Sequence, residues 1–496
     1  MKKVVIIGSG FAGLSAASFM AKAGWDVTVL EKHHMPGGRA RQLKADGFTF
    51  DMGPSWYWMP DVFEHFFNCF GKKVEDYYQL LRLDPSYRIY WEEGSTDIPA
   101  NYEALKKLFE TIEKGSAAKL DRFLDQAAYK YEVGIGKLVQ QPGQSVTEFL
   151  DIDLLKGIFR SDVFTSMKKH IAKYFTDPKL QELMEFPVLF LGALAKDIPA
   201  LYSLMNYADI KLGTWYPKGG MYMIVDGMYQ LAKELGVKFL FNHDVVEIKI
   251  EMGIARSLVA LCQLPPTHCS FEADVVIGAA DYHFIESKLL PANCRSYSEG
   301  YWNKRVMAPS CLLYYVGLNK KLNNTLHHTL FFDTDFDVHG AEIYTKPQWP
   351  KAPLFYVSAT SVSDDSVAPQ GCENLFFLVP VATGLEGDTE GLRNEYFEKI
   401  LSRFEKRTGQ EVRDSIVYKQ SYSVSDFVND YNAFKGNAYG LANTLSQTAV
   451  LKPGLRSKKV QNLFYTGQLT VPGPGVPPSL ISGEVVAREV MKYFGT

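Results

Sequence analysis

The amino-acid sequence predicts an α/β fold whose three domains are interleaved along the chain. Two short apolar runs near the N-terminus, residues 4–7 and 27–30, enclose a helical pattern, as two buried parallel strands joined by a crossover helix do. Hydrophobic residues make up 46% of the 496 residues and charged residues 22%, an ordinary globular composition. No low-complexity linker separates the later segments, so separate domains joined end to end are not expected.

The balance of charged residues excludes several classes of protein. There are 53 Lys and Arg residues against 56 Asp and Glu residues, which rules out a generic cationic surface for nucleic acid.

The six cysteines include no CxxC pair, so we predict no metal site. Aromatic residues reach 14%, which fits a large apolar ligand, although additional core packing explains the same number.

A glycine-rich loop connects the first apolar run to the helical pattern over residues 14–23, and its sequence is Gly8-Ser9-Gly10-Phe11-Ala12-Gly13. In a dinucleotide-binding loop of this spacing, the first glycine allows a tight turn and the second lets the backbone approach a pyrophosphate. The third lets the helix pack closely on the strand. The helix then presents free N–H groups and its positive dipole end to the phosphates. The loop therefore predicts a dinucleotide-binding site.

Glu31 ends the second apolar run and supports the same interpretation. An acid at this place accepts hydrogen bonds from ribose hydroxyls and favours a free 2′-hydroxyl over a 2′-phosphate. A glycine motif alone is a weak signal. Here it has a strand before it, a helix after it, and a second strand that ends in the acid.

The next motif, Gly37-Gly38-Arg39, extends the pattern. The whole N-terminal string resembles the FAD-binding signature of the amine oxidase and carotenoid desaturase superfamily. The resemblance implies a Rossmann-type FAD-binding domain, and it implies that Lys32, Gly38 and Arg39 bind the cofactor. Arg39 is expected near the pyrophosphate and the ribitol chain.

Later segments resemble the same superfamily and imply further contacts with FAD. A loop after the strand over residues 48–50 is expected near the isoalloxazine ring. The backbone of Val245 is expected at the adenine. A Pro- and Gly-rich loop before a predicted helix over residues 482–494 is expected at the flavin pyrimidine and the ribityl chain. The residues implied in the two loops are Gly53, Pro54, Ser55, Gly467, Gly475, Val476 and Pro477.

The resemblance spans essentially the whole chain and is strongest to bacterial phytoene desaturase-type carotenoid desaturases. The segments that carry it are Leu326–Thr329, Pro353–Tyr356, Ala368–Glu373, Val379–Pro380, Ser425–Phe427 and Asn432–Gly436. It implies an FAD-dependent desaturase that introduces C=C bonds into an acyclic carotenoid by hydride transfer to the flavin. The 1′-hydroxycarotenoid 3,4-desaturase branch is favoured, although no single residue establishes it.

Other functions of the same fold stay open. They are a phytoene desaturase, another flavin oxidase or saturase, and a lipid-binding chaperone without redox chemistry. His327 and His328 are weak catalytic candidates, either as a proton acceptor or as a partner for a substrate hydroxyl. The expected electron acceptor is oxygen or a quinone, because no second dinucleotide motif is present.

Three domains follow from the placement of these motifs. The FAD-binding domain is expected to comprise residues 1–90, 220–285 and 445–496. A helical subdomain is expected over residues 91–219, and a strand-rich, mixed-sheet substrate domain over residues 286–444.

We also expect contact with a membrane, because a carotenoid is dissolved in lipid. No stretch of the sequence is predicted to cross a bilayer, so the expected location is cytoplasmic and peripheral, at the inner face of the cell membrane. Residues 145–210 are predicted to be mainly helical, with a basic and aromatic face that suits an interface. That face comprises Phe159, Phe164, Met167, Lys168, Lys169, Tyr174 and Phe175.

Overall fold

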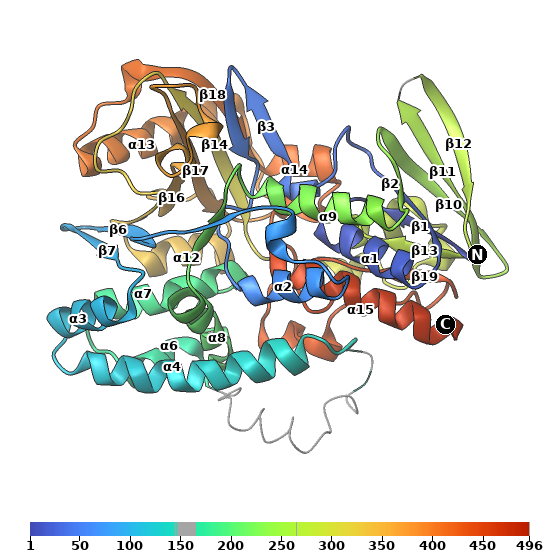
Figure 1. The fold of residues 1–496 in the computed structure, drawn as a ribbon, viewed down its shortest axis with the longest axis horizontal. Coiled ribbons are helices and arrows are strands. Elements are labelled where there is room, and N and C mark those ends of the chain that lie inside the picture. Colours follow the sequence, from blue (N-terminus) through green and yellow to red (C-terminus); the bar gives the residue numbers. More distant parts are fainter. Residues whose placement is uncertain (144, 146–164, 264, 496) are drawn as a thin grey trace.

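The computed structural model describes residues 1–143, 145, 165–263 and 265–495, and a parallel sheet of five strands lies at the centre of one half (Figure 1). Its strand order is β19-β13-β1-β2-β9. Segments from both ends and the middle of the chain build it, so the N-terminal motif cannot form this sheet alone. The strands are β1 (Lys3–Ile7), β2 (Asp26–Leu30), β9 (Lys238–Leu240), β13 (Val275–Gly278) and β19 (Leu463–Tyr465).

Each face of this sheet is covered by a different layer. Helices α1 (Phe11–Lys22), α9 (Tyr222–Glu234) and α15 (Val476–Phe494) cover one face. On the other face, apolar side chains of the sheet share a core with a three-stranded antiparallel sheet and with two short helices. These elements are β10 (His243–Glu251), β11 (Ile254–Gln263), β12 (Pro266–Glu272), α10 (Tyr282–Phe284) and α11 (Glu299–Asn303).

A mixed sheet of seven strands forms the other half, in the order β18-β14-β17-β16-β15-β6-β7. Only β15 and β6 run parallel; the other neighbours are antiparallel. The predicted domain boundary at residue 90 falls within β6. Residues from both of the predicted domains that meet there therefore contribute to this sheet. The strands are β6 (Tyr87–Trp91), β7 (Ser95–Ile98), β14 (Ser310–Leu318), β15 (His328–Phe332), β16 (Phe355–Ser358), β17 (Glu373–Val381) and β18 (Ile416–Tyr422).

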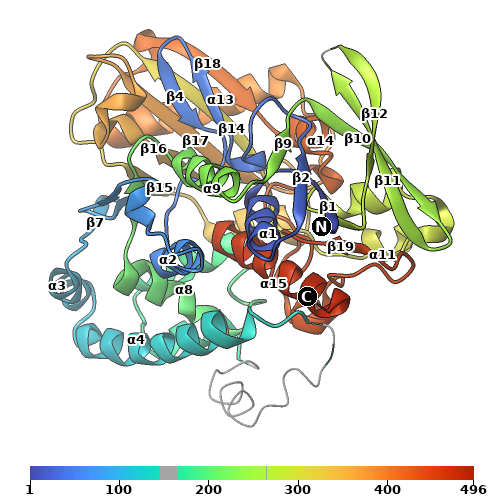
Figure 2. The same ribbon diagram turned by 45° about the vertical axis from the view of Figure 1, so that its right-hand side comes forward.

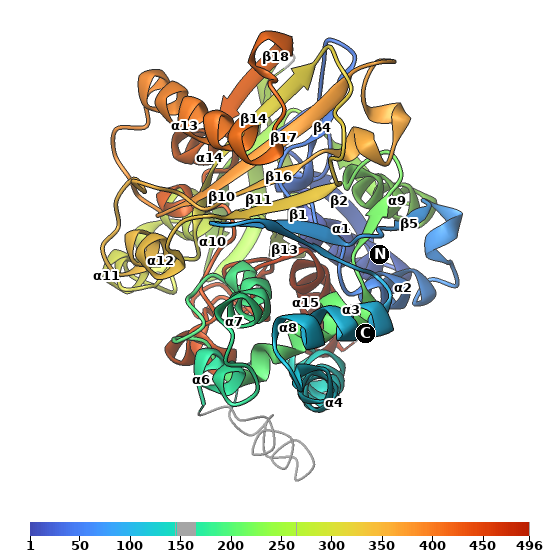
Figure 3. The ribbon, with the colours of Figure 1, turned by 90° about the vertical axis from the view of Figure 1, so that its left-hand side faces the viewer.

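Side chains alternate between the two faces of this sheet. On β14, Leu312 and Tyr314 pack with helix α13 (Glu390–Thr408), whereas Leu313 and Tyr315 face the large central core. Figure 3 shows α13 above the sheet and a group of helices below it. That group includes α3 (Tyr102–Ile112), α4 (Ser116–Val133), α6 (Met167–Ala172), α7 (Pro178–Glu185) and α8 (Leu204–Tyr207).

Shorter elements connect the two halves. Strand β3 pairs with β4, and β5 pairs with β8, each pair antiparallel. The elements are β3 (Gln42–Ala45), β4 (Phe48–Asp51), α2 (Pro60–Asn68), β5 (Leu80–Arg82), β8 (Trp215–Pro217), α12 (Phe336–Tyr344) and α14 (Val424–Tyr431). The division into three domains with stated boundaries stays a prediction.

Two predictions about helices need correction. The sequence predicts the C-terminal helix only over residues 482–494, but α15 begins at Val476. Pro477 and Pro478 lie in its first turn, where the N–H groups have no acceptor within the helix and proline therefore fits.

The second correction concerns the expected membrane face. Met167 and Phe175 are fully buried in the central core, so they cannot present an interface to lipid. Phe159 and Phe164 fall outside the described residues. Within the described part of the chain, no helix is both long and apolar enough to cross a bilayer.

Helices α1 and α15 lie side by side, and both chain termini lie near them (Figure 2). The hydroxyl of Ser15 donates a hydrogen bond to the carbonyl oxygen of Leu480, over 2.8 Å. Gly483 permits this approach, because an added Cβ would overlap the carbonyl oxygen of Ala12 and lie 2.6 Å from the Cβ of Ser15. This contact fixes the relative position of the two helix N-termini.

We expect Gly483→Ala to lower the free energy of unfolding by about 1–3 kcal/mol, since the helices would have to separate. The measurement is urea unfolding of the purified protein. Gly391→Ala is the matched control, because an added Cβ on this exposed glycine of α13 has only the Thr389 hydroxyl at 3.9 Å. Equal stability of both variants would contradict the close packing of α1 on α15.

Candidate functional site

A cavity begins at the carboxyl ends of the parallel strands and continues beneath the seven-stranded sheet. Every residue predicted to bind the cofactor lines it except Gly13, which lies directly behind its wall. The lining residues from that prediction are Gly8, Ser9, Gly10, Phe11, Ala12, Glu31, Lys32, Gly38, Arg39, Gly53, Pro54, Ser55, Val245, Gly467, Gly475, Val476 and Pro477. The structure thus brings together segments that lie far apart in the sequence.

The three glycines of the N-terminal loop have different surroundings. Gly8 has a φ of +97°, a conformation that favours glycine, and its N–H donates to the carbonyl oxygen of Leu30 over 2.8 Å. An added Cβ on Gly13 would overlap the carbonyl oxygen of Gly8. An added Cβ on Gly10 would meet no atom within 4 Å, so it would project into the cavity. Gly10 therefore keeps open the space that a pyrophosphate needs.

Two helix N-termini face this space. Helix α1 begins immediately after Gly10, and its first turn leaves N–H groups without an acceptor in the helix. Helix α15 begins after Gly475, but two of its first residues are prolines and carry no N–H group. Both helices present a positive dipole end to the cavity, whereas α1 offers more donors for an anion.

Glu31 is 5% exposed and holds the glycine-rich loop in place. One carboxylate oxygen accepts bonds from the N–H and the hydroxyl of Ser9, over 2.8 and 2.6 Å. The other accepts from the N–H of His33 over 3.0 Å. Because each carboxylate oxygen accepts two bonds, the second oxygen retains capacity for a ribose hydroxyl. The ribose contact stays a prediction, and the loop contact adds a structural role to it.

Arg39 is a half-buried cation on the cavity wall, and desolvation lowers the pKa of its guanidinium while the carboxylate of Asp281 opposes that shift. Its Nη2 donates to the carbonyl oxygen of Asn437 over 3.0 Å, and its guanidinium lies 5.1 Å from the ring centre of Tyr431. Its Nε has no hydrogen-bond partner among the described residues. A half-buried cation whose Nε lacks a partner fits an anionic group such as a pyrophosphate. Lys32 differs, because its Nζ donates to the carbonyl oxygen of Asn429.

Two further glycines complete the polar end of the cavity. An added Cβ on Gly53 would lie 2.7 Å from the carbonyl oxygen of Arg39, so this loop must contain glycine to pack there. Gly467 has a φ of +108°, and its N–H donates to the hydroxyl of Ser482 over 3.0 Å. The open space at Gly10 and the unpaired Nε of Arg39 together fit a bound dinucleotide.

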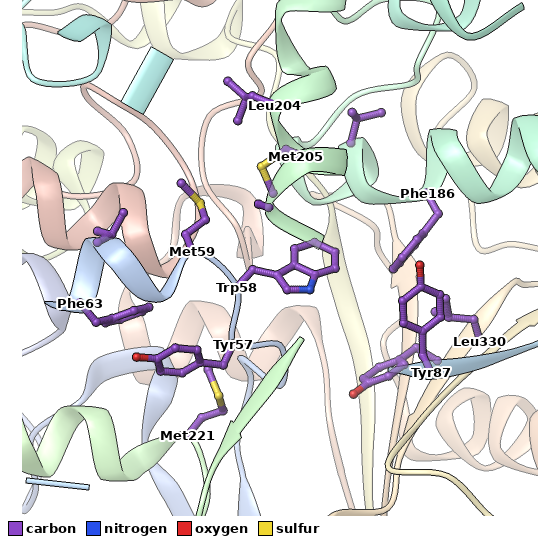
Figure 4. Close-up of a cluster of buried hydrophobic side chains, with 14 of the residues drawn as sticks. Tyr57, Trp58, Met59, Phe63, Tyr87, Phe186, Leu204, Met205, Met221 and Leu330 are labelled. Carbon is purple, nitrogen blue, oxygen red and sulfur yellow. The ribbon is translucent and has the colours of Figure 1, made fainter. Parts of the chain in front are cut away.

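The far end of the cavity is apolar and aromatic. Figure 4 shows Tyr57 and Trp58 pointing to opposite sides of the chain, with Trp58 directed toward Phe186. The ring centres of Trp58 and Phe186 are 6.0 Å apart. Other lining residues at this end come from α12 and the seven-stranded sheet, and they include Leu313, Leu330, Phe332, Phe336, Ile343, Leu354 and Leu378.

The two histidine candidates do not line this cavity. His328 stacks on Trp56, with ring centres 4.1 Å apart, and its Nδ1 lies 2.6 Å from the hydroxyl oxygen of Tyr356. His327 lies 4% exposed beside Tyr216, and burial lowers its pKa to about 3. His328 lies on the same face of β15 as Leu330 and Phe332, but its ring contacts Trp56 and Tyr356, which line the cavity in its place, and His327 precedes the strand. Direct contact of either imidazole with a ligand is therefore not supported.

Sequence reasoning missed the aromatic residues at the junction of the polar and apolar ends. Trp56 and Tyr356 line the cavity there, and Ser55 lies near the Tyr356 hydroxyl. Trp56 follows directly after the predicted Gly53–Ser55 loop, so extending that motif by one residue would have found it. Tyr356 belongs to the Pro353–Tyr356 segment that carries the family resemblance, but nothing in that segment assigns this residue to the site.

Among the described residues, no group of His, Cys, Asp and Glu side chains has the composition of a metal site. The absence of a metal stays a prediction.

Comparison with known proteins identifies the family. The model of the flavin-containing amine oxidoreductases matches residues 11–491. The chain belongs to this family. It carries the flavin FAD as its cofactor, as the N-terminal motif predicts.

Relatives extend along the whole chain. The chain is 42% identical to the carotenoid 3,4-desaturase of Haloarcula japonica, over 99% of this chain and 98% of the relative. It is 32% identical to the zeta-carotene-forming phytoene desaturase of Myxococcus xanthus, over 99% and 94%. Among solved structures, an oxidoreductase from Methanosarcina mazei aligns with a TM-score of 0.64 at 16% identity, covering 98% of this chain and 100% of that one. This structure supports the fold.

We expect Gly10→Val to abolish FAD retention in a folded protein, because the new side chain begins at a Cβ with no protein atom within 4 Å and projects into the space expected to hold the pyrophosphate. Flavin absorbance per protein measures retention, and the melting temperature of the flavin-free protein measures folding. Gly391→Val, on the exposed side of α13, should retain FAD. Undiminished flavin in Gly10→Val would rule out this loop as the pyrophosphate site.

Proposed function

We propose that the protein is an FAD-dependent desaturase of acyclic carotenoids, with a 3,4-desaturase of hydroxylated carotenoids favoured over a phytoene desaturase. One observation carries the proposal: the flavin cradle and a long apolar cavity are continuous. Such a cavity suits an extended hydrocarbon, part of which would lie next to a flavin bound at the predicted residues. The full-length similarity to a carotenoid 3,4-desaturase, at 42% identity, supports the narrower choice.

The reaction divides between the cofactor and the protein. FAD held by the predicted residues would supply a hydride acceptor, and the substrate would lose a hydride and a proton from adjacent carbons to give a C=C bond. The residues of the chain orient the polyene, and the apolar walls formed by Trp58, Phe186 and Leu330 exclude water from it. Because a polyene delocalises the charge that develops at an allylic carbon, the site needs few ionic groups.

A lipid-dissolved substrate has consequences for where the enzyme works. The protein is proposed to act at the inner face of the cell membrane as a peripheral protein, and to pass electrons from reduced flavin to oxygen or a quinone. The solubility of a carotenoid supports the membrane contact. Co-sedimentation with anionic vesicles at low and high salt tests it, and absence from the vesicle fraction in both would contradict it.

A panel of substrates tests the proposed function. The purified, FAD-loaded protein is supplied with phytoene, lycopene and 1′-hydroxylated acyclic carotenoids in liposomes, and products are followed by chromatography and absorbance. We expect a red-shifted product from the hydroxylated substrates, because each added double bond lengthens the conjugated system. Product from phytoene alone would replace the 3,4-desaturase assignment with an early desaturase. No product from any carotenoid would contradict the proposal.

A further inference from the structure

Tyr356 lies where the polar and apolar ends of the cavity meet. It belongs to β16, lines the cavity and is only 6% exposed. Ser55, from the loop expected at the flavin ring, interacts with its phenol, as does Ser358. Trp56, the next residue of that loop, lies with its ring centre 5.5 Å from that of Tyr356. The phenol is therefore adjacent to the place where flavin and substrate meet.

Behind Tyr356 lies a buried imidazole. The Nδ1 atom of His328 is 2.6 Å from the Tyr356 hydroxyl oxygen, a short hydrogen bond between two buried groups. Burial and the neighbouring His327 hold the pKa of His328 well below its usual range, so the imidazole is neutral. A neutral imidazole has one nitrogen that accepts a proton.

Several polar atoms around this pair are buried without a hydrogen-bond partner, which destabilises the fold. The Nε2 of His328 and both ring nitrogens of His327 have no hydrogen-bond partner among the described residues. A buried polar group without a partner reduces the stability of the fold, because it loses its hydrogen bonds to water. Trp56 stacks on His328 with the ring planes 13° apart, which fixes the orientation of the imidazole toward Tyr356. Apolar side chains would fill the same space without this cost.

A histidine on α12 also lines the cavity, but both of its ring nitrogens already have partners within the protein. His339 lines the cavity, but its Nδ1 accepts from the N–H of Leu354 and its Nε2 donates to the carbonyl oxygen of Pro380, both over 3.0 Å. Neither nitrogen is available for proton transfer. His328 differs from His339, because its Nδ1 atom bonds to the hydroxyl of a residue that lines the cavity, Tyr356.

We propose that Tyr356 accepts the proton that the substrate loses, and that His328 takes up the phenol's own proton in the same step. This inference rests on the proposed desaturase function and assigns the proton acceptor within it. The substrate C–H electron pair enters the new C=C bond, and the proton moves to Tyr356 Oη. The Tyr356 O–H bond breaks toward His328 Nδ1, so the phenol stays neutral and the imidazole gains the charge. The hydride from the neighbouring carbon reduces FAD, which balances the two electrons.

The weak basicity of His328 is compatible with this role. A polyene that has lost a hydride is a strong carbon acid, so a weak base is sufficient to take its proton. The same weak basicity releases the proton once the product has left and water enters. The pair thereby resets without an additional reactant.

Anaerobic flavin reduction by a carotenoid, followed by stopped-flow absorbance, tests the proposal. Tyr356→Phe retains the ring and should bind FAD normally but slow flavin reduction by about 100-fold, the lower range for a positioned general base. Tyr314→Phe is the matched control. It removes another buried hydroxyl of the same sheet, one that bonds the carbonyl oxygen of Arg393 on the α13 side, outside the cavity.

His328 acts through Tyr356, so it is a positioning and relay residue and needs a second readout. His328→Phe keeps an aromatic ring against Trp56 but removes Nδ1. We expect it to slow flavin reduction by a similar factor, and the double variant with Tyr356→Phe to be no slower than either single variant. The wild type should also reduce flavin more slowly in D₂O, and both variants should lose that solvent isotope effect.

The outcomes separate this inference from the proposed function. Flavin reduction by the wild type, with an unchanged rate in Tyr356→Phe, would overturn the proton-acceptor role and leave the desaturase standing. Multiplying rate losses in the double variant would show that His328 acts independently of Tyr356. No flavin reduction by any carotenoid in the wild type would overturn both claims.

Discussion

The close approach of helix α1 to the loop that leaves β1 determines where the rest of the site lies. There is no room for a side chain on Gly13 against the carbonyl oxygen of Gly8, and Glu31 fixes the same loop through Ser9. With the loop held in this way, the open space beside Gly10 points into the cavity. Packing of α15 on α1 through Gly483 then places a second helix N-terminus beside the first.

The continuity of the cavity depends on how the two sheets are connected. Loops at the ends of the parallel strands supply its polar end, and the inner face of the seven-stranded sheet supplies its apolar end. The loop at Gly53 spans the junction, because it packs on Arg39 at one end and leads to Trp56 at the other. In the proposed function, a hydrocarbon and a flavin would share this cavity, and Tyr356 would lie between their expected positions.

The sequence was most informative at positions where the backbone conformation or the space around it requires glycine. Gly8, Gly10 and Gly13 have environments that only glycine satisfies or that keep space open, so their spacing was a reliable signal. Helix α13 was missed within a stretch predicted to be strand-rich, although Tyr396, Phe397, Ile400 and Leu401 follow a helical period. The His328–Tyr356 contact joins two strands that pair antiparallel, and nothing local in either segment reveals it. Contacts of this kind depend on register and tertiary packing.

The most direct measurement is an experimental structure of the FAD-loaded protein with a bound acyclic polyene. The account predicts the pyrophosphate beside Gly10 and the flavin ring at the loop that holds Gly53. It predicts the polyene along the apolar walls near Phe186, with its reacting carbons between the flavin and Tyr356. FAD at another place, or a polyene bound outside this cavity, would contradict the account.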